Sequence, residues 1–220
     1  MLRPALIALA AAALASAAWA ADPAPAPDPA PIEGDVIAAP HPATHLMEFK
    51  IVAAEGVVAF SVPETWRVVG MKSFPPVAGA AFQVVNPADE GTSDATNVAV
   101  DIYHTDDAAG RAGLALMGKA YGASTPHIDH YQGWTTYASE PTMTATPYTL
   151  IDATRPFADL HVTVGVRCAW PHLAKNAPGY DAQMLAACHA LLGSVYSQPG
   201  PYRPAPGEVL RRPPPATPAG

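Results

Sequence analysis

Alternating apolar and polar positions predict several β-strands in the middle of this chain. In the stretch MEFKIVAAE, residues 47–55, the odd-numbered positions up to 53 are apolar, and Glu48 and Lys50 lie between them. A period of two places the apolar side chains on one face of a strand. The run VVAFSV, residues 57–62, follows a Glu-Gly turn signal, so the two runs together predict a β-hairpin.

Six further segments have the pattern of strands. They are rich in β-branched residues or alternate between apolar and polar positions, and turn-forming residues separate them. They span residues 67–73, 79–86, 96–105, 133–139, 143–154 and 159–168. In the last of them the apolar residues from Leu160 to Cys168 alternate with polar residues and glycine, which predicts a strand with one buried face.

Two segments predict helices. Residues 106–122 begin with two aspartates, Asp106 and Asp107, either of which can cap the helix start. They place apolar side chains on one stripe, although three glycines weaken this helix. The second helix begins near Tyr180. The order of strands, helix, strands and helix, with short connections, predicts an α+β domain. We expect a mainly antiparallel sheet with helices packed on it.

Proline and apolar composition divide the chain into four segments. Residues 1–20 have a basic start, an apolar run and an Ala-Trp-Ala end, which is typical of a cleaved signal peptide. Residues 21–45 predict a Pro/Ala-rich linker and residues 199–220 a Pro-rich disordered tail, because neither has apolar periodicity. Residues 46–198 remain as a single domain of ordinary size. We therefore expect a periplasmic protein, or alternatively a secreted one, with no integral membrane segment after signal cleavage.

The charge balance argues against nucleic acid as a partner. The chain has 12 Lys and Arg against 19 Asp and Glu, a formal net charge of −7. Proteins that bind nucleic acid depend on clustered basic side chains that neutralise phosphates. The acidic balance itself favours no particular ligand.

The two cysteines predict a disulfide bond. Cys168 ends the apolar face of its strand, and Cys188 lies in the middle of the apolar stripe of the final helix. Both thiols point into the same layer, and export carries them to an oxidising compartment in which disulfides persist. His189 points about 100° away from Cys188 around the helix, so the two do not align as base and nucleophile. The prediction is a Cys168–Cys188 bond.

Two histidines are the candidates for a metal site. His127 and His130 are three residues apart in PHIDHY, residues 126–131. On a helix they would share a face and could bind zinc or copper. Pro126 and the following Gln-Gly-Trp favour a strand or loop instead, in which this spacing points the rings to opposite faces. We expect surface or partly buried histidines and no metal.

No sequence motif predicts catalytic residues or a cofactor. The chain has no G-x-S-x-G elbow, no P-loop, no dinucleotide fingerprint and no HExxH motif. A hydrolase site could still assemble from dispersed residues, for which His104, His127, His130 and Asp152 are the candidates.

The stretch FSVPETWRVV, residues 60–69, resembles the start of the Mog1/PsbP-like superfamily, which includes DcrB-type bacterial envelope proteins. The pattern F-x-[IV]-P-x-x-W is present here as Phe60, Val62, Pro63 and Trp66. The resemblance continues through TNVAVDIY and a C-terminal helix, and it covers most of residues 46–197. It implies an α/β/α sandwich with a central antiparallel sheet. It also implies an adaptor, assembly factor or binding module without catalytic residues.

Together these features predict an exported, non-enzymatic binding or assembly module of the bacterial cell envelope. Its partner is expected to be another envelope protein or component. The alternatives are an envelope hydrolase with a dispersed His/Asp site and a periplasmic metal-binding protein.

Overall fold

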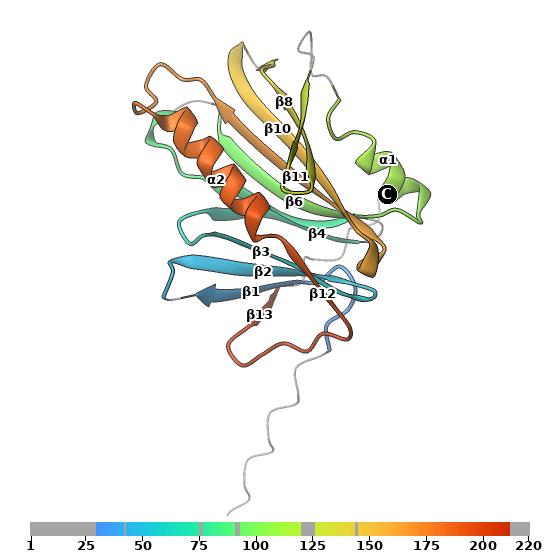
Figure 1. Cartoon of the computed structure of the whole chain (residues 1–220). Helices are drawn as coiled ribbons and strands as arrows, with labels where there is room; N and C mark the ends of the chain where they lie inside the picture. The colour runs from blue at the N-terminus through green and yellow to red at the C-terminus, as the bar shows by residue number, and fades with distance from the viewer. Residues whose placement is uncertain are drawn as a thin grey trace, which may run out of the picture.

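The computed structural model describes residues 30–41, 43–74, 77–90, 93–119, 126–143 and 145–211. Within these ranges the chain forms two antiparallel sheets and two α-helices (Figure 1). The signal peptide predicted for residues 1–20 lies outside the described residues.

The smaller sheet has five strands from both ends of the described chain. Its strands are β1 (Val36–His41), β2 (Leu46–Ala53), β3 (Gly56–Pro63), β12 (Tyr196–Pro199) and β13 (Val209–Arg211). Their order is β12-β3-β2-β1-β13, and every neighbouring pair is antiparallel. The hairpin predicted for residues 47–62 is present as β2 and β3, so this prediction is confirmed.

The larger sheet has eight strands. They are β4 (Arg67–Phe74), β5 (Val77–Val84), β6 (Thr96–His104), β7 (His127–Tyr131), β8 (Trp134–Ser139), β9 (Thr142–Met143), β10 (Thr146–Phe157) and β11 (Val162–Pro171). The order is β4-β5-β6-β11-β10-β8-β7, and the short β9 pairs with β10.

The main core lies between one face of the larger sheet, which we call the inner face, and the five-stranded sheet. Phe82 of β5 meets Phe49 of β2 and Phe60 of β3, with ring centroids 4.9 and 6.1 Å apart. All three rings are buried. Burying each such side chain contributes about 1.5–3 kcal/mol, so this aromatic contact is a major reason why the two sheets pack together.

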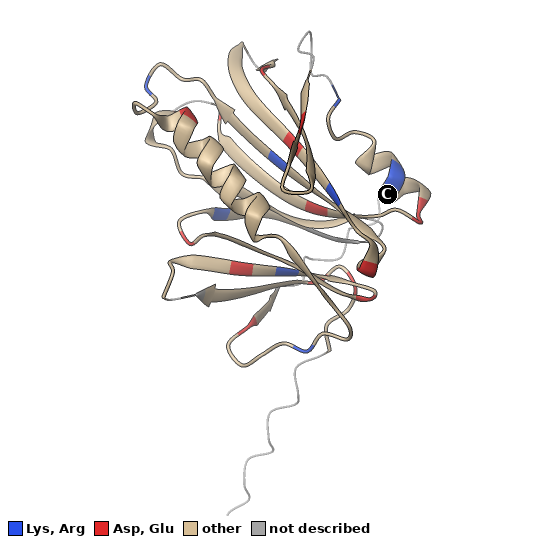
Figure 2. Ribbon diagram, in the orientation of Figure 1, with Lys and Arg blue, Asp and Glu red and all other residues tan. Residues whose placement is uncertain are grey.

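Helix α2 (Tyr180–Ser194) completes the cover over the inner face (Figure 1). Its apolar residues Met184, Leu191 and Leu192 join the same core as the two sheets. The indole Nε1 of Trp134 on β8 donates a hydrogen bond to the carbonyl oxygen of Leu192 at 3.1 Å. Asp181 is the one Asp, Glu, Lys or Arg residue of this helix (Figure 2). No helix of the described residues is long and apolar enough to cross a membrane.

The predicted α+β class, with an α/β/α sandwich, is wrong. The protein is predominantly β, because a second sheet covers most of the inner face where the prediction placed helices. The β2–β3 hairpin shows the physical reason. Phe49 and Phe60 pack against Phe82 of the larger sheet, so a second sheet supplies the apolar cover that the prediction assigned to helices.

The predicted boundaries of the linker and the tail need correction. Val36 and Ile37, assigned to the linker, are fully buried in β1. Val209 to Arg211, assigned to the disordered tail, form β13, which pairs with the start of β1. The compact unit therefore extends beyond residues 46–198 at both ends.

The predicted Cys168–Cys188 disulfide is present. It joins β11 to α2 across the core, and both cysteines are buried. Structural disulfides of this kind persist in oxidising compartments, which indicates that the protein folds outside the reducing cytoplasm.

The segment after β12 is held on the outside of the five-stranded sheet by Lys50. Its ammonium donates hydrogen bonds to the Tyr202 hydroxyl and to the Glu208 carboxylate, and it lies 3.1 Å from Glu48. Tyr202 also donates to Glu208. Burial alone would raise the pKa of Glu208, but the hydrogen bonds from Lys50 and Tyr202 outweigh burial and hold the pKa below its ordinary value.

The variant Glu208→Gln is expected to lower the free energy of unfolding by about 1–2 kcal/mol at pH 7, because a hydrogen-bonded charge is lost. A carboxyl group with a depressed pKa stabilises the fold above its ordinary pKa and loses that contribution as the pH falls through the depressed value. The difference between the variant and the wild type should therefore shrink by pH 3. Urea unfolding at both pH values measures it. The control Glu64→Gln removes an exposed partner of His45 and should cost less than about 0.5 kcal/mol.

Candidate functional site

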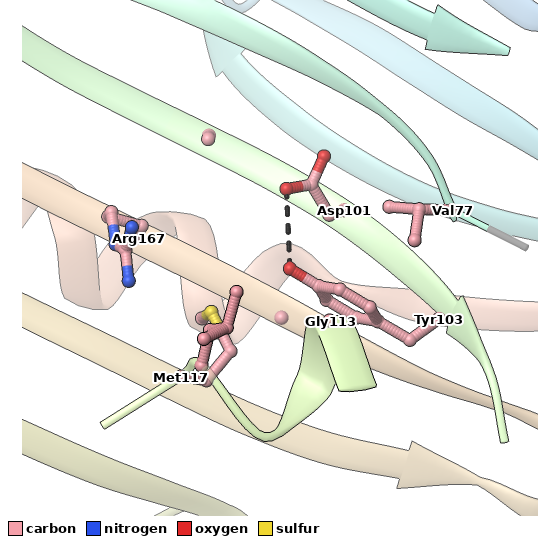
Figure 3. A pocket seen from close by; sticks show the side chains of 9 residues that line it. Val77, Asp101, Tyr103, Gly113, Met117 and Arg167 are labelled. Atoms are coloured by element: carbon pink, nitrogen blue, oxygen red, sulfur yellow. Dashed lines mark hydrogen bonds between the residues drawn. The ribbon is translucent and has the colours of Figure 1, made fainter. Parts of the chain in front are cut away.

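A pocket lies on the outer face of the larger sheet, on the side away from the five-stranded sheet. Its volume is about 430 Å³. Strands β5, β6 and β11 form its floor, and α1 (Ala108–Leu114) with the turn that follows forms its wall (Figure 3). The lining residues are Val77, Ala99, Asp101, Tyr103, Gly113, Leu116, Met117, Gly165 and Arg167.

Helix α1 is capped at its start, and the turn beyond its end is bound to the sheet. Asp107 caps its start, and the carboxylate Oδ1 accepts hydrogen bonds from the amides of Ala109 at 2.7 Å and Gly110 at 3.3 Å. Beyond its end, the amide of Gly118 donates to Asp152 Oδ2 on β10 at 2.9 Å. Gly118 has a φ of +70°, which only glycine adopts without strain. The helix predicted for residues 106–122 is shorter than expected, since the chain turns back toward the sheet after Leu114.

Tyr103 is the central side chain of the pocket. Its ring lies between β11 and α1, because Gly165 and Gly113 carry no side chains there. An added Cβ would come within 2.8 Å of the ring at Gly165 and 2.9 Å at Gly113. The Tyr103 hydroxyl points toward Asp101 Oδ2, at 3.5 Å (Figure 3). Burial, and after it the charge of Asp101, raises the pKa of Tyr103, so the phenol remains protonated at neutral pH.

A buried ion pair lies beside Tyr103. Asp152 is 1 % exposed and receives two hydrogen bonds from Arg167 on β11, from Nε at 2.7 Å and from Nη2 at 2.8 Å. This bidentate geometry fixes the orientation of the guanidinium. Arg167 thereby presents a fixed positive group at the end of the pocket.

Asp101 has an unusual position in the sheet. The strand register places Gly79 of β5 on one side of it and Gly165 of β11 on the other. The carboxylate lies close against the neighbouring strand, since a Cβ at Gly79 would come within 2.1 Å of its Oδ1, and the residue is only 9 % exposed. Glycine within a strand often marks a place where a ligand or another backbone approaches closely.

The candidate hydrolase residues do not converge. His104, at the end of β6, pairs with Glu33 at 3.1 Å. Asp152 on β10 is far from His104. It pairs with Arg167 on β11, and Arg167 pairs with Ala99, which is five residues before His104 on β6. Among these candidates, Asp152 adjoins the pocket through its hydrogen bonds with the lining residue Arg167.

The candidate metal ligands lie on the edge strand β7. His127 and His130 are both exposed, and their spacing in an extended strand puts them on opposite faces. Within the part of the chain that the structure describes, no three His, Cys, Asp or Glu side chains gather in a way that could hold a metal ion.

His189 is not a partner of Cys188. Its ring stacks on Tyr131 of β7, with ring centroids 4.4 Å apart, while Cys188 points into the core. This arrangement agrees with the expected 100° separation around the helix.

Sequence reasoning did not single out Tyr103, Asp101 or Arg167. The alternation in residues 96–105 placed Asp101 and Tyr103 together on one face, but a polar face is the ordinary expectation for a strand exposed to water. The sequence feature that could have indicated the site is Gly165, in the middle of the strand predicted at residues 159–168. A glycine there indicates a close approach by another group.

No protein-family model matches the chain, and no curated protein matches it. The resemblance of residues 60–69 to the Mog1/PsbP-like superfamily is therefore not confirmed by a family model. Among solved structures, the chain is similar to LpqN of Mycobacterium tuberculosis, a protein described as involved in cell envelope biogenesis. The TM-score is 0.41 and the identity 14% over 71% of this chain and 94% of LpqN, so this is a distant likeness of fold.

Proposed function

We propose that this protein is an exported, non-enzymatic binding module of the bacterial cell envelope and that the pocket beneath α1 is its binding site. The observation that carries the proposal is the construction of the pocket. Apolar side chains, namely Val77, Leu116 and Met117, surround a small number of polar groups fixed by hydrogen bonds. Ligand sites in proteins commonly combine an apolar lining with a few placed polar groups in this way.

The polar groups of the pocket support binding more than catalysis. A nucleophile needs a neighbouring base with which it can exchange a proton. Here the Asp152 carboxylate is occupied by Arg167, and the Tyr103 phenol stays protonated. The arrangement favours recognition of a ligand by fixed dipoles and charges.

The periplasm is the proposed location. The Cys168–Cys188 bond supports an oxidising compartment, and the signal-like composition of residues 1–20 supports export. The partner proposed from the sequence, another envelope component, would present its ligand group to the outer face of the larger sheet.

The proposal is tested by filling the pocket. Ala99 lies on the floor, so Ala99→Leu would occupy part of the volume. We expect it to weaken binding of the neutral fluorescent probe N-phenyl-1-naphthylamine at least tenfold, as measured by fluorescence titration. The control is Ala169→Leu. Ala169 is half-buried on β11, on the sheet face that carries the pocket, but it does not line the pocket. Equal affinities of both variants, or no probe binding by the wild type, would refute the assignment.

A further inference from the structure

We propose that the outer side of the five-stranded sheet, which faces away from the larger sheet, is a docking surface for an extended segment of another protein. That segment carries a carboxylate between an aromatic and an apolar side chain. Residues 201–211 of this chain, which we call the arm, cover the surface when the partner is absent. The inference goes beyond the proposed function, because the pocket beneath α1 lies on the opposite side of the two sheets (Figure 1).

The arm is held loosely along most of its length. It follows β12 and ends in β13, where three residue pairs join it to β1. Residues 203–207 are all exposed, and the prolines of the arm have no amide hydrogen to donate. A hollow of about 770 Å³ lies between the arm and Pro31. Segments with few packed contacts open locally at a low cost in free energy while the core stays folded.

Lys50 of β2 makes the polar contacts that hold the arm. Its side chain is 12 % exposed, and its ammonium donates to the Glu208 carboxylate at 2.5 Å and to the Tyr202 hydroxyl at 3.0 Å. Burial alone would lower the pKa of Lys50, but the hydrogen bonds to Glu208, Tyr202 and Glu48 outweigh burial and raise it. The amine therefore stays charged at neutral pH.

The position at Lys50 selects a carboxylate on the docked segment. An ammonium group has three donors, and the arm supplies two of their three acceptors here. Glu48 is the third. It also accepts a hydrogen bond from Tyr196, and it remains with the sheet when the arm leaves. A segment that replaces the arm restores the strongest lost contact only if it brings a carboxylate in the place of Glu208.

The arm also covers apolar side chains. Ile37 of β1, Val52 of β2 and Val57 of β3 form a small cluster on the outer side of the sheet and are almost fully buried. Tyr202 and Leu210 of the arm pack against this cluster. Without the arm the cluster would face water, so an aromatic and an apolar side chain of the partner would be favoured at the same places. The edge of β1 would accept the partner as an added strand, which is a common mode of peptide recognition.

The arm competes with the partner because it is tethered to the sheet. A segment on a short linker has an effective concentration of roughly millimolar, so a free segment of equal quality binds weakly. Weakening the contact between the arm and Lys50 should therefore open the surface to a free peptide.

The test adds the arm as a separate peptide to the full chain. The probe is a fluorescein-labelled peptide with the sequence of residues 200–211, GPYRPAPGEVLR, and fluorescence anisotropy measures its binding. The protein variant Glu208→Gln loosens its own arm but keeps Lys50, so it should bind the peptide at least tenfold more tightly than the wild type does. The control variant Glu64→Gln changes an exposed glutamate outside the arm and should bind the peptide as the wild type does.

A second peptide tests the need for the carboxylate. The same peptide with the change Glu208→Gln should bind the loosened protein variant at least tenfold more weakly than the original peptide. Equal affinities of the two peptides would overturn the proposal, as would equal affinities of the loosened variant and the wild type for the original peptide. The two peptides can also be compared on the wild type at millimolar concentration, so the test stays decisive if the variant does not fold.

The mass of the wild type in solution distinguishes the other possible occupant. We expect light scattering to give a monomer. A dimer that dissociates in the variant Lys50→Met would assign the surface to the arm of a second copy of this chain, and a partner of different sequence would then be the wrong choice.

Discussion

Replacing Arg167 with methionine is expected to lower the free energy of unfolding by about 3 kcal/mol. The change removes both hydrogen bonds to Asp152 and leaves a carboxylate that is 1 % exposed with the amide of Gly118 as its donor. Removing one partner of a buried ion pair typically costs 3–5 kcal/mol, and the partial exposure of Arg167 places the expected cost at about the lower limit. Urea unfolding followed by tryptophan fluorescence measures the difference.

The matched control is Arg155→Met. Arg155 lies on β10, and its guanidinium packs over the ring of Phe157, with 5.0 Å from Cζ to the ring centroid. Losing this contact should cost about 1 kcal/mol or less. The double variant Asp152→Ala with Arg167→Met should recover part of the loss, because no buried charge remains. Equal effects of the two single arginine variants would show that the buried pair has no special part in stability.

Removing the disulfide by replacing Cys168 and Cys188 with alanine is expected to cost about 3 kcal/mol. The bond closes a loop with a sequence separation of 20 residues, for which the chain-entropy model gives about this value. The bond also fixes α2 to β11 in the middle of the core. Urea unfolding under non-reducing conditions should show the lower stability.

Reductant provides the control for the disulfide variant. Dithiothreitol should destabilise the wild type by a similar amount and leave the double alanine variant unchanged. A wild type whose unfolding midpoint does not respond to the reductant would contradict the stabilising role of the bond, provided that mass analysis shows complete reduction.

The positions of most strands could be predicted because each has a period of two or a run of β-branched residues. The strand predicted at 159–168 is shifted in the structure to Val162–Pro171, since residues 158–160 form a short 3-10 helix before it. The cysteine pairing could also be predicted, because the side-chain directions of a strand and a helix follow from their periods. These predictions depend only on local sequence.

The division into two sheets could not be predicted in the same way. Pairing of β12 with β3, and of β13 with β1, joins segments at opposite ends of the described chain, and no local pattern indicates such partners. The composition of β1 also did not predict a strand. It contains Pro40 and follows a proline-rich stretch, and proline is disfavoured within strands.

The candidate site depended on the same long-range information. Asp101 and Arg167 come close only because β6 pairs with β11, and Asp152 joins them because β10 pairs with β11 on the other side. Each of the three is an ordinary polar residue of an alternating strand when it is considered alone. The site arises from the order of the strands.

The pairing of Val36 with Arg211 determines how the domain would respond to a pulling force. The start of β1 and the end of β13 lie side by side, about 5 Å apart in an antiparallel pair. A load applied between these two points would break the hydrogen bonds of the short β1–β13 pair one after another. It would not shear whole strands past one another. Under tension β13 would detach first, while the opposite face of the molecule, with the pocket, would bear none of the load at that stage.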